Sequence, residues 1–149
     1  MTNLEKRILI VDDDDAIRAL LFTVLRRRGY AVDAARHGRE ATERLLRCNY
    51  AVMLLDLMMP MMNGWEVLEF LEQVPRERRP LVVVLTAGPE PRDLDAEIVA
   101  GTLRKPFDIQ LVIDMVSACV ASTGGRMQPD SCPAADSTKR GGSTPDRVN

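Results

Sequence analysis

Four hydrophobic runs in this sequence each end at or shortly before a reactive polar residue. These residues are Asp12 and Asp13 after ILIV, Asp56 after VMLL, Thr86 after LVVVL, and Lys105 one arginine after the brief Thr102-Leu103 segment. If the runs are neighbouring parallel strands, their carboxyl ends lie along one edge of a sheet, where open α/β folds place their ligand sites. The pattern predicts that three acids, a hydroxyl and a cation share one cleft.

Hydrophobic periodicity predicts alternating strands and helices between these runs. Strands are expected at 7–12, 30–35, 51–56, 81–85 and 102–104, and helices at 14–28, 38–48, 65–73, 92–100 and 108–121. The helix at 92–100 is expected to be short and to follow Pro91. Strands that alternate with helices favour right-handed crossovers and a parallel sheet with helices on both faces.

Length and composition favour one folded domain. The 149 residues carry a formal net charge of -2 with both signs mixed, which argues against a direct nucleic-acid partner. No apolar stretch near the N-terminus is long enough for a signal sequence or a membrane span, so we expect a cytoplasmic protein. The domain is expected to cover 1–121, and the Gly-, Pro- and Ser-rich segment 122–149 is expected to be a disordered tail.

The three clustered acids predict a site for a hard divalent cation. Carboxylates that share one edge repel each other, and a cation relieves that repulsion. Ligation by oxygen alone, without nearby His or Cys, favours Mg²⁺, which readily bridges carboxylates to a phosphoryl group. Asp56 is the candidate nucleophile, because carboxylates can accept phosphoryl groups covalently. Thr86 and Lys105 are suited to donate to and neutralise the phosphoryl oxygens.

The same residues stand within four blocks that resemble a known family. VDDDDAIRALL, LLDLMMPMMNGWEVL, VVVLTAG and LRKPF, in this order, are similar to the signature blocks of the response regulator receiver domain of two-component signalling. The resemblance covers roughly residues 5–121. It implies a flavodoxin-like, five-stranded parallel sheet in the order 2-1-3-4-5, with the site beyond the carboxyl ends of the strands.

The resemblance also implies a role for each site residue. Asp56 matches the phosphoacceptor, and Asp12 and Asp13 match the acidic pair that binds Mg²⁺. Met58 matches the position whose backbone carbonyl also ligates the ion. Thr86 matches the switch hydroxyl, and Lys105 matches the phosphate-pairing lysine, which is usually followed by a cis proline, here Pro106. A partner histidine kinase or phosphotransfer protein is implied as the phosphoryl donor. Such a domain is not an enzyme acting on a separate substrate, because it promotes only its own phosphorylation and dephosphorylation.

The chain departs from the family pattern near its last strand. Thr102 stands three positions before the lysine, where receivers often carry an aromatic residue that couples to the switch hydroxyl. Only eighteen residues separate Thr86 from Lys105, and the interval begins with Gly88-Pro89. We therefore expect a shortened or displaced fourth helix. Partner docking on that side of the domain is expected to differ from the family's usual readout.

The functional prediction is a stand-alone response regulator that signals through protein-protein contacts. A phosphorelay intermediate or a phosphate sink would use the same residues and differ in lifetime and partner. A pseudo-receiver adaptor is less favoured, because all the polar positions are present. A hydrolase of the haloacid dehalogenase type expects a second Asp two residues after the nucleophile, where this chain has Met58.

Three polar residues near these motifs have simpler interpretations. Asp14 and Asp15 are interpreted as capping and first-turn residues of a helix, because anions favour a helix N-terminus. His37, the only histidine, is interpreted as an exposed loop residue, which argues against a histidine phosphotransfer module.

Overall fold

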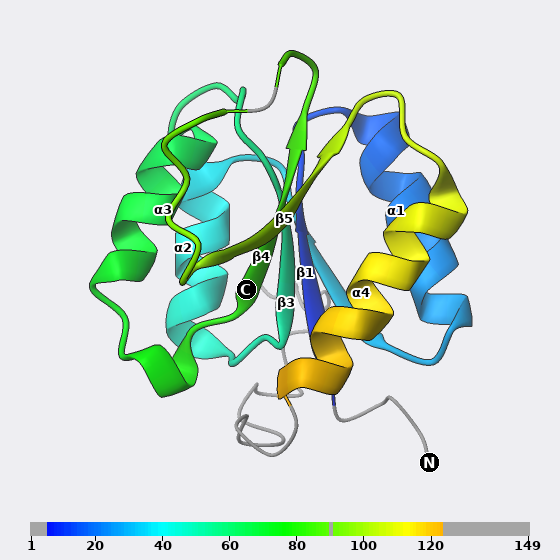
Figure 1. The fold of residues 1–149 in the computed structure, drawn as a ribbon, viewed down its shortest axis with the longest axis horizontal. Helices are drawn as coiled ribbons and strands as arrows, with labels where there is room; N and C mark the ends of the chain where they lie inside the picture. The colour runs from blue at the N-terminus through cyan, green and yellow to red at the C-terminus, as the bar shows by residue number, and fades with distance from the viewer. Residues whose placement is uncertain (1–5, 90, 124–149) are drawn as a thin grey trace, which may run out of the picture.

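The computed structural model describes residues 6–89 and 91–123 of the chain (Figure 1). Along the chain the elements are β1 (Arg7–Val11), α1 (Asp15–Arg27), β2 (Ala31–Ala35), α2 (Gly38–Arg47), β3 (Val52–Asp56), α3 (Gly64–Glu72), the 3₁₀ turn Arg76–Arg78, β4 (Leu81–Thr86), β5 (Val99–Arg104) and α4 (Ile109–Thr123). Of the predicted tail, 122–149, the part that follows Thr123 lies outside the described residues.

The five strands form one parallel sheet in the order β2-β1-β3-β4-β5, as predicted. Every residue of β3 is buried, and so are all residues of β4 after Leu81. A strand covered on both faces needs such a continuous apolar run. The segments VMLL and LVVVL therefore specify β3 and β4, the two strands at the centre of the domain.

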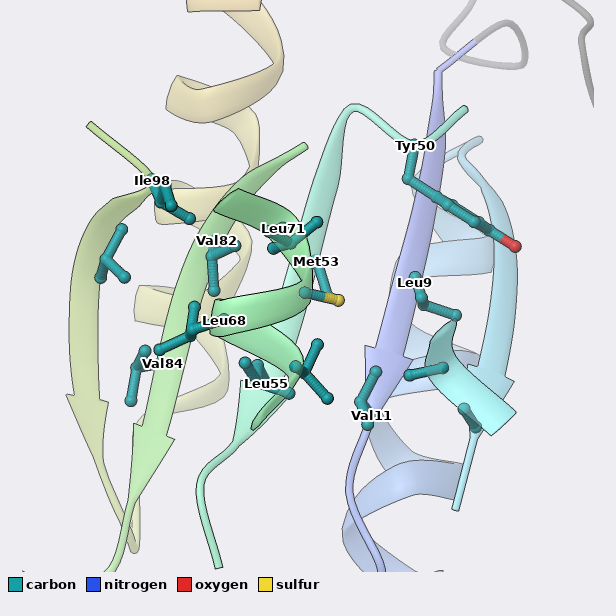
Figure 2. Close-up of a cluster of buried hydrophobic side chains, with 14 of the residues drawn as sticks. Leu9, Val11, Tyr50, Met53, Leu55, Leu68, Leu71, Val82, Val84 and Ile98 are labelled. Atoms are coloured by element: carbon teal, nitrogen blue, oxygen red, sulfur yellow. The ribbon is translucent and has the colours of Figure 1, made fainter. Parts of the chain in front are cut away.

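Helices cover both faces of the sheet (Figure 1). On one face α2 and α3 pack against the sheet, and on the other face α1 and α4 do so. Alternate residues of each central strand point to opposite faces and enter opposite clusters. Figure 2 shows the cluster under α3, in which Leu68 and Leu71 meet Val82, Val84 and Ile98. Within the described residues, no helix is both long and apolar enough to cross a membrane.

Local signals start and stop the helices where the sequence indicates. Asp14 caps α1 by accepting hydrogen bonds from the backbone N–H groups of Ala16 and Ile17 at 2.9 and 3.1 Å. Gly29 follows α1 with φ +94°, a conformation that glycine adopts without strain. Asn63 and Glu66 form a reciprocal capping box at the start of α3.

The prediction of a helix at 92–100 is wrong. The described residues between β4 and β5 form an irregular connection, and the only regular structure near its end is a turn in which Asp95 O accepts hydrogen bonds from Ile98 and Val99 N–H at 3.0 and 2.8 Å. β5 begins at Val99 instead of residue 102, and Val99 pairs with Val82 of β4. Burial of two adjacent β-branched side chains beside the sheet therefore outweighs the local helical propensity. The expected shortened fourth helix is thus missing from the described part of this connection.

Several side-chain predictions also need correction. Helical spacing in the sequence predicts Leu20 and Leu111 on the inner faces of α1 and α4, and Leu46 as a possible inner residue of α2. All three side chains are instead exposed, Leu46 to 69%. His37 is half-buried, not exposed, and its Nδ1 accepts a hydrogen bond from the Glu40 N–H at 3.3 Å. It therefore caps α2, a role that Ser, Thr, Asp and Asn usually fill.

Candidate phosphoryl-accepting site

The predicted polar residues meet at one edge of the sheet. Asp12 directly follows β1, Asp56 and Thr86 end β3 and β4, and Lys105 directly follows β5. The strands concerned are neighbours, and all are parallel, so their carboxyl ends lie together at the top edge in Figure 1. Parallel topology alone therefore gathers residues that are up to 93 positions apart in the chain, from 12 to 105.

Three carboxylates form a compact cluster at this edge. One oxygen from each of Asp12, Asp13 and Asp56 lies within 4.8 Å of the others. Asp12 is fully buried and Asp56 is 4% exposed, whereas Asp13 faces solvent. The cluster therefore has two fixed members inside and one member at the surface.

Short-range hydrogen bonds orient the two buried acids. Asp12 Oδ1 accepts the N–H of Asp14 at 2.8 Å, and Asp56 Oδ1 accepts the N–H of Met58 at 3.1 Å. Such contacts to the backbone two residues ahead are common for Asp at the end of a strand. They occupy one oxygen of each carboxylate and leave both Oδ2 atoms directed to a shared cation.

Lys105 supplies that cation. Its Nζ lies 3.0 Å from Asp12 Oδ2 and 3.5 Å from Asp56 Oδ2. The Lys105 N–H donates to Thr86 O at 2.7 Å, and the following bond to Pro106 is cis, as the sequence predicted. Burial alone would lower the pKa of Lys105. The hydrogen bond to Asp12 and the negative charges of Asp12 and Asp56 have the larger combined effect, so the pKa of Lys105 is raised. The lysine is therefore held charged.

Asp56 is the acid whose protonation the site perturbs most clearly. Burial, with the charge of Asp12 as a further cause, raises the pKa of Asp56 to about 6, against the lowering effects of the Met58 hydrogen bond and Lys105. A buried carboxylate beside another carboxylate favours its neutral form. A divalent cation at the cluster would reverse that preference.

We expect Asp56→Asn to stabilise the protein in EDTA at pH 7.5, by about 1 to 2 kcal/mol after allowing for water at the open edge. Because the folded-state pKa lies above the unfolded value, ionisation of Asp56 costs stability as pH rises from about 4 to 6, and the cost persists above pH 6. The gain should therefore vanish near pH 4. Urea unfolding at both pH values measures it, and an equal gain at both would contradict the assignment of the pKa to Asp56.

Thr86 and Met58 occupy the remaining predicted positions. Thr86 is 8% exposed, and its Oγ1 accepts the N–H of Gly88 at 3.2 Å. Among the described residues no hydrogen bond joins Thr86 to Asp56. Met58 contacts Asp56 through its backbone, and its side chain is exposed.

The donor set fits a hard divalent cation. The three candidate side-chain ligands are carboxylates, which suit Mg²⁺. Asp12 Oδ2 is buried, and within the described residues its close contact is the ion pair with the Lys105 ammonium at 3.0 Å. A buried carboxylate oxygen with so few partners can still coordinate a metal cation.

Sequence reasoning missed one residue that supports the cluster. Arg18 Nη1 donates to the backbone oxygen of Asp12 at 2.8 Å, and Arg18 Nη2 pairs with the Asp15 carboxylate. The contact fixes the turn between β1 and α1. Its sequence signal is weak, because an arginine in the first turns of a helix usually faces solvent. Asp14 caps α1 and Asp15 lies in its first turn, as interpreted from the sequence, and Asp15 pairs there with Arg18.

The chain belongs to the response regulator receiver domain family, whose profile matches residues 8–117. It is the receiver domain of a two-component response regulator, with the flavodoxin-like fold of that family.

Curated relatives and solved structures agree with this family. The transcriptional regulatory protein ResD of Bacillus subtilis is 39% identical over 117 residues, covering 76% of this chain and 48% of ResD. The transcriptional regulatory protein SrrA of Staphylococcus aureus is 33% identical over 135 residues, covering 89% of this chain and 55% of SrrA. This chain therefore spans about half the length of the curated relatives that it matches.

Two solved structures illustrate the likeness. The response regulator TrrA of Thermotoga maritima, in complex with Mg²⁺-BeF, has a TM-score of 0.68 and 32% identity, over 76% of this chain and 98% of that chain. A CheY-like receiver domain protein of Methanospirillum hungatei has a TM-score of 0.71 and 28% identity, over 80% and 97% of the two chains.

Proposed function

We propose that Asp56 of this receiver accepts a phosphoryl group from a partner histidine kinase or phosphotransfer protein. The observation that carries the proposal is the shared position of the Asp56 carboxylate, the Lys105 ammonium 3.5 Å away and the adjoining acidic pair. A nucleophilic carboxylate, a fixed counter-charge and a cation site are the elements that phosphoryl transfer needs. The protein acts in the cytoplasm and has no separate substrate to turn over.

The transfer step assigns a task to each residue. An Asp56 oxygen attacks phosphorus, the bond between phosphorus and the donor imidazole nitrogen breaks, and the imidazole leaves with the electron pair. Lys105 neutralises charge on the phosphoryl oxygens. Thr86 moves toward these oxygens and donates its hydroxyl hydrogen to one of them, which makes it the switch residue.

Asp12, Asp13, Asp56 and the Met58 carbonyl would hold Mg²⁺. When bound, the ion neutralises developing negative charge and orients the phosphoryl oxygens. Asp12 is held for this role by Asp14 N–H and by Arg18. Asp13 stays at the surface, where it can reach the ion without a burial cost.

We predict that Asp13→Ala weakens Mg²⁺ binding by about tenfold or more, because one of three anionic ligands is removed. Isothermal titration of the unphosphorylated protein measures the affinity directly. Asp114→Ala is the matched control, since Asp114 is an exposed carboxylate on α4. Equal affinities for Asp13→Ala and the control would exclude Asp13 as a ligand.

We further propose that this receiver signals through contacts with a partner protein. A relay intermediate or phosphate sink would rest on the same site, so phosphotransfer from candidate kinases, followed over time, separates the three functions. A long-lived phosphoprotein favours a regulator, onward transfer to a second histidine favours a relay, and rapid return of phosphate to the kinase favours a sink. A pseudo-receiver adaptor would stay unmodified by acetyl phosphate and Mg²⁺.

A further inference from the structure

A groove lies between α3 and the connection from β4 to β5. Its cavity volume is about 270 Å³. Its lining residues are Trp65, Leu68, Glu69 and Glu72 of α3, Asp93, Leu94, Asp95 and Ile98 of the connection, and Val99 of β5. The α3 residues recur at helical spacing and so form one stripe along the helix. Figure 1 shows the connection running beside α3 without a helix of its own.

The floor of the groove is apolar and firmly packed. Leu68, Ile98 and Val99 are at most 8% exposed and belong to the core cluster drawn in part in Figure 2. Trp65 is 39% exposed at the side of the groove, and Leu94 is half-buried there. A large aromatic side chain with this exposure offers contact area that is not used by the core.

The rim of the groove is acidic. Glu69, Glu72, Asp93 and Asp95 contribute four carboxylates, and the lining contains no lysine, arginine or histidine. Within the described residues Glu69, Glu72 and Asp93 form no ion pair, and Asp95 accepts only the N–H of Glu97 through its side chain. These carboxylates are separate from the cluster around Asp56.

We propose that this groove binds a basic segment of a partner protein that inserts one apolar side chain between α3 and the connection. Four carboxylates around an apolar floor complement a leucine-sized side chain flanked by lysine or arginine. An acidic or nucleic-acid partner would be repelled. The groove is distinct from the phosphoryl-accepting cluster, because the two share no residue.

The test uses the whole chain and a synthetic peptide in which one leucine is flanked on each side by three lysines. Trp65 is the only tryptophan, so its fluorescence reports on the groove directly. We expect a saturable change in emission below about 1 mM peptide. A peptide with serine in place of leucine, and a peptide with glutamates in place of the lysines, should each bind at least tenfold more weakly.

Charge-reversal variants locate the binding. Glu69→Lys with Glu72→Lys should weaken the lysine peptide at least tenfold and strengthen the glutamate peptide. The matched control is Glu43→Lys with Glu77→Lys, which reverses two exposed carboxylates outside the groove lining. Thermal melts of both double variants verify that they are folded. Equal loss in the two variants, insensitivity to the leucine, or no saturable response would each overturn the proposal.

Discussion

Asp56→Asn is expected to reduce phosphoryl incorporation to background, a loss of about a hundredfold or more. The substitution keeps the shape of the side chain and an oxygen that can accept the Met58 N–H. It removes the nucleophilic carboxylate and leaves Lys105 with one carboxylate partner, Asp12. Incubation with labelled acetyl phosphate and Mg²⁺, followed by gel separation, measures incorporation without requiring the cognate kinase.

The matched control for that experiment is Asp114→Asn, which makes the same chemical change on the exposed surface of α4. It should incorporate phosphate as wild type does. Incorporation by Asp56→Asn equal to that of the control would remove Asp56 as the acceptor. Loss in both variants would show that the assay responds to something other than the site.

Gly64→Ala is expected to destabilise the domain by about 3 kcal/mol and to lower phosphorylation as well. A Cβ at Gly64 would lie 2.6 Å from both Asp56 O and Leu57 Cα. Both neighbours are backbone atoms, so no side-chain rotation relieves the contact. The segment that carries Asp56 must shift or α3 must move away from it.

Urea unfolding of Gly64→Ala measures this cost, and Gly88→Ala is its control. A Cβ at Gly88 meets no atom within 4 Å, and its φ is not in the left-handed region. Gly88→Ala should therefore leave stability within about 0.5 kcal/mol of wild type. If both variants unfold at the same urea concentration, close packing at Gly64 does not limit stability.

The positions of the site residues could be predicted because their signal is local. Each of Asp12, Asp56 and Thr86 comes at the end of a buried apolar run, and parallel topology then brings the run ends together. The sheet order and the cis bond before Pro106 followed from the family resemblance and are confirmed. The proposed chemical roles remain to be tested.

The errors arose where pairing within the sheet or the conformation of a loop decides the outcome. The segment around Asp95 has a composition that suits a helix, but pairing of Val99 with Val82 draws its end into the sheet. The capping bond of His37 depends on a loop conformation that the sequence does not encode in a recognisable motif. Arg18 reaches the Asp12 carbonyl only because β1 and α1 meet at a close turn.

The single ammonium shared by two buried acids sets the charge balance of the whole edge. With all three carboxylates ionised, Asp12, Asp13 and Asp56 contribute -3 and Lys105 contributes +1, which leaves -2. One divalent cation brings this sum to zero. A phosphoryl group on Asp56 replaces one carboxylate charge with about two phosphoryl charges, so the edge becomes negative again by about one unit. Neutral hydrogen-bond donors must then stabilise the added charge, and the hydroxyl of Thr86, at the end of the neighbouring strand β4, is a candidate for that role.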